Sequence, residues 1–487
     1  MTSAQSTVHT ASGDISGTVE GTGVRAYRGI PYAAPPVGPL RWRPPQPAAA
    51  WTGVHDGSRF GFDPIQLNEP AARGSLAPGM SEDCLTLNVW APASVPSGGA
   101  PVLVWFDGGG FTADSGAKIR TDGTHFAKRG AVLVTVNYRV GVFGFLAHPA
   151  LTAESPQHAS GNYGFLDAIA ALQWVRDNIA AFGGDPKRIT AFGESAGGAV
   201  VAALLISPLA RGTFDQVILQ SPGSFRPLSP LADAETAGLV AGSDLTAMRA
   251  MTAVELLPLN AKINPAVRGL TIPRPLRTII DGWSIDRDEV DAFRSGTFAH
   301  VPAIVGSNAY EGGWFTANIP VRTTEKLRAY VADNYGDMVD EAWSYYGADA
   351  DAAVERAVGD AFGDAQFSYG ARSLAKEISK RQPKTFRYLF THAGAHTSNP
   401  PVHSDDVIYV FGNGTFDAAD QRVSDAMMAA WVQFAATGDP NGPGMPAWAP
   451  YDSGRDNYLT FGGDMTEGSG WRTKSLDFIE RFYAARA

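Results

Sequence analysis

The sequence predicts an α/β fold with a central, mostly parallel sheet. Apolar strand-like runs recur roughly every 30 residues, and segments with helical spacing of apolar residues separate them. A sharp glycine-flanked turn at 193–197 joins one of these runs directly to a helix-like run. No charge block, low-complexity linker or repeat marks a boundary, so we expect one domain over residues 1–487.

The individual elements follow this alternation along the chain. The first 60 residues are rich in Gly, Pro and aromatic residues, which predicts short strands joined by turns. We expect a late helix with Ser424 as its N-cap and Gly438 just past its end. The buried strands are predicted at 101–106, 131–137, 189–192, 216–220, 301–306 and 386–390, and helices at 167–182, 199–205 and 424–437.

Two long segments, 225–300 and 315–385, are helix-rich and lack the strand–helix alternation. We interpret them as insertions that cover a pocket. In a parallel sheet the functional site lies at the carboxyl ends of the strands, so these insertions are expected to shape the site.

Composition and charge exclude several classes of protein. The formal net charge of −10 is spread along the chain without a basic stripe, which argues against nucleic acid as a partner. No apolar run is long enough to span a bilayer, and the first residues lack the basic and apolar parts of a signal peptide. The single cysteine, Cys84, cannot form an intrachain disulfide, so we expect a cytoplasmic location.

The turn at 193–197 has the pattern that mounts a serine nucleophile. Ser195 stands between Gly193 and Gly197, after a strand-like run and before an apolar helix-like run. Such a turn strains the backbone of the serine and exposes its hydroxyl at the top of the sheet, and the glycines leave room for close packing. The alternative is a structural glycine-rich turn.

A serine nucleophile needs a base and an acid that orients this base. Glu311 follows the strand 301–306 and is flanked by glycines, so we assign it as the acid. His392 lies at the end of a predicted strand and is expected to be structural. His396 and His403 both lie in the following loop, and the residues alone leave both open as the base, with His403 favoured.

Oxyanion donors are expected from two backbone segments. The amide of Ala196 follows the nucleophile at the start of its helix. The glycine run 108–110 follows the strand ending at Phe106, and glycines let backbone N–H groups approach a ligand closely. The alternative for this run is a flexible turn.

Five segments give the chain a resemblance to the type B carboxylesterase family, which includes bacterial p-nitrobenzyl-type esterases and the cholinesterases. The resemblance covers nearly the whole chain and implies an α/β-hydrolase fold with an N-terminal strand meander and large helical insertions. It also implies ester hydrolysis through an acyl-serine intermediate. The segments are 28–38 (RGIPYAAPPVG), 81–88 (SEDCLTLN), 137–145 (NYRVGVFGF), 182–198 (FGGDPKRITAFGESAGG) and 437–441 (TGDPN).

The resemblance assigns roles residue by residue. Ser195 matches the family nucleophile and Glu311 its acid, and His403 matches the base because 402–412 (VHSDDVIYVFG) resembles the family segment around that histidine. It also implies Gly109, Gly110 and Ala196 as oxyanion donors, and Ser221 as a serine near the acid, for which a strand-end hydroxyl bonded to backbone is the alternative. Glu194, Asp107 and Asp406 are expected to lie next to the catalytic groups without reacting themselves.

Three departures from the family pattern have consequences. Asp107 precedes the glycine run where the family has His or Tyr, so we expect its side chain to point away from the oxyanion or to be held by a cation or by backbone donors. Ile65 takes the place of a cysteine that would pair with Cys84. The loop 65–84 has no Trp, so choline esters are poor candidate substrates.

The expected activity is hydrolysis of small, uncharged carboxylic esters, with no cofactor and no metal, since the sequence shows no metal-ligand cluster or nucleotide-binding loop. Hydrolysis of carbamates or amides by the same groups stays open, and a non-catalytic binding protein is a third alternative. The oligomeric state is left open. Four aromatic residues next to the motifs are candidates for the pocket: Phe111, Trp314, Phe315 and Phe411.

Overall fold

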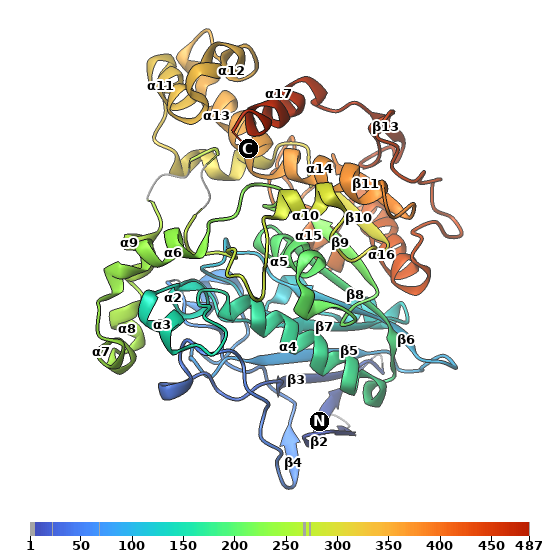
Figure 1. The fold of residues 1–487 in the computed structure, drawn as a ribbon. Coiled ribbons are helices and arrows are strands. Elements are labelled where there is room, and N and C mark those ends of the chain that lie inside the picture. The colour runs from blue at the N-terminus through green and yellow to red at the C-terminus, as the bar shows by residue number, and fades with distance from the viewer. Residues whose placement is uncertain (1–4, 22, 68, 266–268, 272–273, 487) are drawn as a thin grey trace.

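A 13-stranded sheet runs through the computed structural model, which describes residues 5–21, 23–67, 69–265, 269–271 and 274–486 (Figure 1). The order of the strands in the sheet is β1-β2-β3-β5-β7-β6-β8-β9-β10-β11-β12-β13, and β4 pairs with β2. The strands are β1 Gln5–Thr10, β2 Gly13–Val19, β3 Arg25–Pro31, β4 Val54–Asp56, β5 Thr86–Ala91, β6 Ala100–Phe106, β7 Val132–Val136, β8 Gly184–Glu194, β9 Gln216–Gln220, β10 Ala303–Asn308, β11 Thr385–Phe390, β12 Asn457–Phe461 and β13 Glu467–Ser469.

The central strands from β7 to β12 are parallel, as the sequence predicts. The strands β1, β2, β3 and β5 form an antiparallel meander at one edge, and β13 is antiparallel at the other. The carboxyl ends of β8, β9 and β10 are therefore neighbours, which brings the segments following residues 194, 220 and 308 to one edge of the sheet.

Helices cover both faces of the sheet because its strands alternate between two cores. In β6, Val102, Val104 and Phe106 belong to one core, and Leu103 and Trp105 to the other. The helices α4, α5 and α14 pack on the first face, and α1, α15 and α16 contribute to the second core. The helices with most direct contact to the sheet are α4 Tyr163–Asn178, α5 Ala196–Ile206, α14 Tyr369–Ser379 and α16 Ala418–Thr437.

Most of the remaining helices lie in the two predicted insertions. Figure 1 shows α11, α12, α13 and α17 together beyond one end of the sheet, and α6 to α9 as a separate group. They are α1 Thr124–Lys128, α2 Gly141–Phe145, α3 Pro149–Glu154, α6 Leu231–Gly238, α7 Leu245–Ala250, α8 Ala253–Leu256, α9 Leu259–Ile263, α10 Glu289–Ser295, α11 Thr324–Tyr335, α12 Val339–Tyr346, α13 Val354–Gly363, α15 Val407–Phe411 and α17 Thr473–Ala484.

The segment 315–385 is not an insertion throughout. Helix α14 packs on β10 and β11 and is the crossover that joins these two parallel strands. A π-helical turn, Asp364–Ser368, connects α13 to α14 without leaving helical geometry. The sequence did not reveal this strand–helix–strand unit because the helices α11 to α13 come between β10 and its crossover helix α14.

The start of α16 also differs from the prediction. Asp417 is the N-cap, and its carboxylate accepts hydrogen bonds from the amides of Ala419 and Asp420. Ser424 lies inside the helix, where its hydroxyl donates to the carbonyl of Tyr409. Gly438 ends the helix in the left-handed conformation, as predicted.

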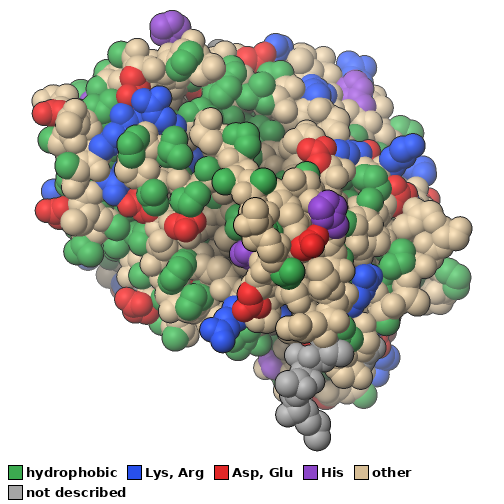
Figure 2. Space-filling view, turned by 90° about the horizontal axis from the view of Figure 1, so that it is seen from below, with side chains coloured by type: hydrophobic (Ala, Val, Ile, Leu, Met, Phe, Trp, Pro, Cys, Tyr) green, Lys and Arg blue, Asp and Glu red, His purple; other side chains and the backbone are tan. Residues whose placement is uncertain are grey.

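The surface mixes charges of both signs. Figure 2 shows Lys and Arg side chains interspersed with Asp and Glu on the face seen from below. Within the described ranges, no helix combines the length and the apolar character that crossing a bilayer would require.

Candidate active site

Ser195 occupies the sharp turn between β8 and α5. Its backbone has φ 58° and ψ −118°, a conformation that is strained for a residue with a Cβ. A Cβ on Gly197 would lie 1.9 Å from the carbonyl oxygen of Phe106, and one on Gly193 would lie 2.6 Å from the backbone of Gly197. The two glycines flanking the serine are therefore required by the approach of neighbouring backbone.

Glu311 and His403 form a buried hydrogen-bonded pair. Nδ1 of His403 lies 2.6 Å from Oε2 of Glu311. The other carboxylate oxygen, Oε1, accepts from the Ser221 hydroxyl and from the backbone N–H of Asn308, both at 2.6 Å. The Ser221 hydroxyl and the Asn308 amide therefore fix the position of the carboxylate, and the carboxylate in turn orients the ring of His403.

Close packing of backbone explains the glycine after Glu311. A Cβ on Gly312 would lie 1.8 Å from the carbonyl oxygen of Gly359 in α13. On the opposite side, the ring of Phe367 stacks on His403 with 4.0 Å between centroids. The helical segment 354–379 thus contacts both the glycine that follows the acid and the histidine ring.

The second ring nitrogen of His403 faces a carboxylate. Nε2 lies 3.1 Å from Oε1 of Glu194, and the Ser404 hydroxyl donates to the same oxygen at 2.7 Å. Burial alone would lower the pKa of His403, but the charges of Glu194 and Glu311 outweigh it and the pKa is raised. Burial raises the pKa of Glu194 to about 7, against the opposing effect of His403.

The other two candidate histidines lie outside this arrangement. His396 is near the surface, and its Nε2 is 2.8 Å from the carbonyl oxygen of Thr415. His392 is buried with Nε2 2.7 Å from Asp420, which agrees with a structural role.

Three backbone amides lie near the serine without a hydrogen-bond partner among the described residues: those of Gly109, Gly110 and Ala196. Gly109 has φ +82° and Gly110 φ +63°, so the loop after β6 depends on the conformational freedom of glycine. Amides in this position can stabilise negative charge on an oxygen atom beside Ser195.

The carboxylate of Asp107 lies near a cation, which is one of the outcomes expected from the sequence, but neither of its oxygens has a hydrogen-bond partner among the described residues. Its Oδ1 lies 3.8 Å from Nζ of Lys118, which itself pairs with Asp114 at 2.5 Å. Burial raises the pKa of Asp107 to about 6, and the charge of Lys118 acts in the opposite direction. Asp406 accepts hydrogen bonds from Tyr388, Gln220 and Asn308 and does not contact His403.

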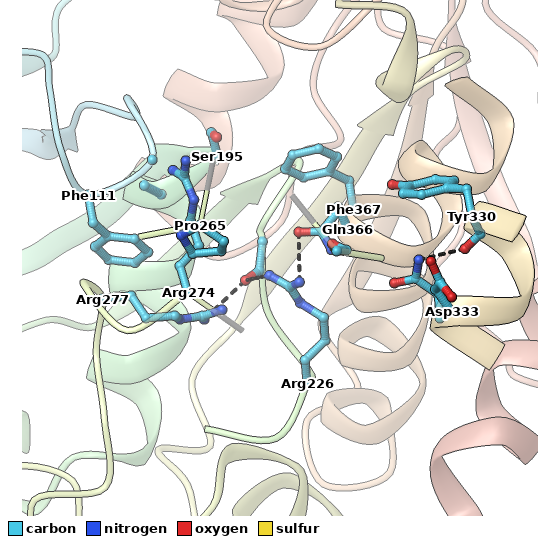
Figure 3. A pocket seen from close by; sticks show the side chains of 15 residues that line it. Phe111, Ser195, Arg226, Pro265, Arg274, Arg277, Tyr330, Asp333, Gln366 and Phe367 are labelled. Carbon is cyan, nitrogen blue, oxygen red and sulfur yellow. Dashed lines mark hydrogen bonds between the residues drawn. The ribbon is translucent and has the colours of Figure 1, made fainter. Parts of the chain in front are cut away.

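Two cavities meet at Ser195. One, of about 330 Å³, is lined by Ser195, Ala196, Phe111, Arg226, Arg274 and Arg277, and we call it the arginine cavity (Figure 3). The other, of about 670 Å³, is lined by Ser195, Glu194, His403, Trp314 and Phe315, and we call it the histidine cavity. Gly110 lines both.

The aromatic candidates are distributed unevenly. Phe111 lines the arginine cavity, and Phe315 and the largely exposed Trp314 line the histidine cavity. Phe411 lines neither: it is fully buried on the opposite face of the sheet, against Trp105 and Phe192. The prediction for Phe411 is wrong because helix α15 turns this side chain toward the core.

Sequence reasoning missed several residues of the site. Asn308 ends β10 three residues before Glu311, and a polar residue at a strand end was a usable signal. Phe367 and the three arginines come from segments without a motif. No group of three or more His, Cys, Asp or Glu with the arrangement of a metal site occurs in the described part of the chain.

Fold and site together define a serine hydrolase of the α/β-hydrolase type, and comparisons with known proteins agree. The model of the carboxylesterase family matches residues 4–479, so the chain belongs to this family and is a carboxylic-ester hydrolase. It is 45% identical to a fumonisin B1 esterase from Sphingopyxis macrogoltabida over 475 residues, which cover 95% of this chain and 87% of that protein.

More distant relatives cover the chain to a similar extent. A human cocaine esterase is 32% identical over 510 residues, covering 94% of this chain and 87% of that protein. The solved structure of a PNB esterase superposes with a TM-score of 0.84 at 30% identity and covers 97% of this chain and all of that one.

Proposed function

We propose that Ser195, His403 and Glu311 hydrolyse the ester as a catalytic triad. The observation that carries this proposal is the 2.6 Å contact between Nδ1 of His403 and Glu311. Nε2 of His403 makes no hydrogen bond among the described residues and lies 3.1 Å from Oε1 of Glu194, and His403, Glu194 and Ser195 line the same cavity. A carboxylate on Nδ1 keeps the proton there, so Nε2 is free to accept the proton of the serine hydroxyl.

The reaction then proceeds in two halves. Oγ of Ser195 attacks the ester carbonyl while its proton passes to Nε2 of His403, and the alcohol leaves with that proton. Water then attacks the acyl-serine with the same histidine as base, which releases the acid and restores the serine. Glu311 orients the imidazole and stabilises its cationic form throughout.

The amides of Gly109, Gly110 and Ala196 bind the oxyanion in both halves. Their support is that no described group accepts from them and that Gly109, Gly110 and Ala196 line the cavities at Ser195. Each such donor is typically worth about 3–4 kcal/mol of barrier.

A burst experiment tests the triad. Wild-type protein mixed with p-nitrophenyl acetate is expected to release p-nitrophenol in a burst, and intact-mass analysis is expected to show one added acetyl group. Ser195→Ala is expected to lose both signals. Ser424→Ala, which removes a buried hydroxyl far from the site, is the matched control and is expected to keep them. A burst that survives Ser195→Ala contradicts the proposal.

We also propose a cytoplasmic location, supported by the single buried thiol of Cys84. Cell fractionation tests it, and recovery outside the cytoplasmic fraction contradicts it. The expectation of an uncharged ester has less support, because three arginines line one of the two cavities at the serine.

A further inference from the structure

Two buried arginines meet beside the nucleophile. Arg226 and Arg277 are 5% and 3% exposed, and one Nη2 of each donates to the carbonyl oxygen of Gly223 at 3.2 Å. The N–H of Gly223 in turn donates to the carbonyl oxygen of Ser195 at 3.4 Å. Both guanidinium groups are therefore connected to the backbone of Ser195 through Gly223. Figure 3 shows the side chains of Arg226 and Arg277 among the residues that line this cavity.

These arginines lack the ion pairs that other buried arginines of this chain have. Arg139 pairs with Asp167 at 2.7 Å, and Arg387 pairs with Asp456 at 2.6 Å. Arg226, Arg274 and Arg277 have no carboxylate within 4.0 Å among the described residues, and the Nε of each makes no hydrogen bond. Arg226 donates hydrogen bonds to the side-chain oxygen of Gln366 and to the carbonyl of Gly223, and Arg277 donates to the same carbonyl.

Nearby carboxyl groups only partly balance this positive charge. Glu289 is close enough to interact with Arg277, but burial raises the pKa of Glu289 to about 7 and it accepts from the N–H of Phe225. Asp333 lines the cavity together with Asn334. Burial and the neighbouring Arg226 lower the pKa of Arg277 to about 10, so it remains a cation at neutral pH.

The histidine cavity has a different charge balance. Its cations, Lys118 and Arg120, are accompanied by the lining carboxylates of Asp114, Glu194 and Asp405. An unpaired cation in a buried cavity is costly unless an anion binds there. The excess of positive charge thus lies on the Arg226–Arg277 side of Ser195.

The position of His403 indicates which part of an ester enters each cavity. His403 lines the histidine cavity, and the departing alcohol must take its proton from Nε2. The ring of Phe367 lies on His403 and also lines the arginine cavity, so it separates the base from the arginines. The acyl group therefore extends into the arginine cavity.

We propose that the acyl group of the substrate carries a second carboxylate, which Arg226 and Arg277 bind, with Arg274 at the edge of the same cavity. The enzyme then hydrolyses half-esters of dicarboxylic or polycarboxylic acids. Ser195 forms an ester with one carboxyl carbon, the alcohol leaves, and water releases the free polyacid. This inference rests on the proposed triad.

The test compares two esters that differ only at the end of the acyl chain. Monomethyl glutarate carries a carboxylate where methyl pentanoate carries a methyl group. We expect kcat/KM to be at least 100-fold higher for the half-ester, since two guanidinium groups bind the carboxylate. Equal rates, or a preference for methyl pentanoate, overturn the inference.

Variants assign the effect to the arginines. Arg226→Met and Arg277→Met are each expected to lower the ratio of kcat/KM for monomethyl glutarate to kcat/KM for methyl pentanoate tenfold or more. The exposed Arg287, paired with Asp286, supplies the control Arg287→Met, which is expected to change neither rate. Equal losses with both esters mean that the arginines are structural and contradict the inference.

Wild-type protein gives a second measurement that needs no variant. Glutarate is expected to inhibit p-nitrophenyl acetate hydrolysis competitively, and more strongly than pentanoate does. Absence of this difference contradicts the inference. A preference for 4-acetoxybutanoate, whose carboxylate is on the alcohol, over monomethyl glutarate contradicts the acyl assignment. Failure of the p-nitrophenyl acetate burst instead refutes the triad, so the two failures are distinguishable.

Discussion

Replacing Glu311 by glutamine is expected to move a proton on His403 without disturbing the fold. Oε1 of Glu311 accepts from the backbone N–H of Asn308 and from the Ser221 hydroxyl, both at 2.6 Å. A glutamine must keep its carbonyl oxygen at that position, because its NH2 group cannot accept the Asn308 hydrogen. The NH2 group then takes the place of Oε2, 2.6 Å from Nδ1 of His403, and donates to it.

This reversal disables the base. With Nδ1 accepting a hydrogen bond, the proton of the neutral ring lies on Nε2, which can no longer take the proton of Ser195. The equivalent change of acid to amide in other triads lowers kcat by about 10⁴. A loss of that size corresponds to about 5.5 kcal/mol of barrier.

The assay is steady-state hydrolysis of p-nitrophenyl acetate, with the urea midpoint as a measure of folding. The matched control is Asp420→Asn, which changes an acid to an amide beside another buried histidine, His392, away from both cavities. We expect Asp420→Asn to keep the wild-type kcat. If Glu311→Gln keeps more than a tenth of the wild-type kcat, Glu311 does not set the tautomer and the reasoning fails.

Three further predictions concern the catalytic histidine and the carboxylates around the site. His403→Ala is expected to lower kcat/KM at least about 10³-fold and His396→Ala to have a mild effect, and the reverse order in a rate assay would reassign the base. Because nearby carboxylates raise the pKa of His403 despite its burial, kcat/KM should rise with pH through an apparent pKa above the usual 6.5, and Glu194→Gln should lower that pKa. An unshifted pH–rate profile contradicts the role of Glu194. Burial raises the pKa of Asp107 to about 6, so its ionisation costs folding free energy that accumulates from about pH 4 to pH 6 and persists above. Asp107→Asn removes this cost and should raise the urea midpoint at pH 8 but not at pH 4; a lower midpoint at pH 8 would show that the charge stabilises the fold.

Local patterns were sufficient for the central sheet and for the turn at Ser195. Buried parallel strands are short apolar runs, which the sequence shows directly. A glycine-flanked serine between a strand and a helix can be recognised from a segment of five residues. Each of the three candidates, Ser195, Glu311 and His403, also follows the end of a predicted strand, which is how the sequence pointed to them. The contact between Glu311 and His403 depends on the neighbouring positions of β10 and β11, which the order of the strands supplies.

Features that depend on side-chain direction could not be predicted in the same way. Phe411 is next to a motif in sequence, but the rotation of α15 points it into the core between Trp105 and Phe126. Arg226 and Arg277 come from irregular segments, and a single arginine in such a segment is most often at the surface. Their convergence depends on the path of the insertion, for which the sequence has no periodic signal.

The π-helical turn Asp364–Ser368 connects the arginines proposed to bind the acyl group with the histidine proposed as the base. A π turn holds one residue more than an α turn, and this one carries both Gln366, the partner of Arg226, and Phe367, the ring on His403. Deleting a single residue here would restore α-helical geometry without rotating α14, because the π turn is what accommodates the extra residue, and Gln366 and Phe367 could not both keep their present positions. The hydrogen bond from Arg226 to Gln366 and the stacking of Phe367 on His403 would then be disturbed together. A change in this turn that alters the acyl preference is therefore expected to alter the rate of proton transfer as well.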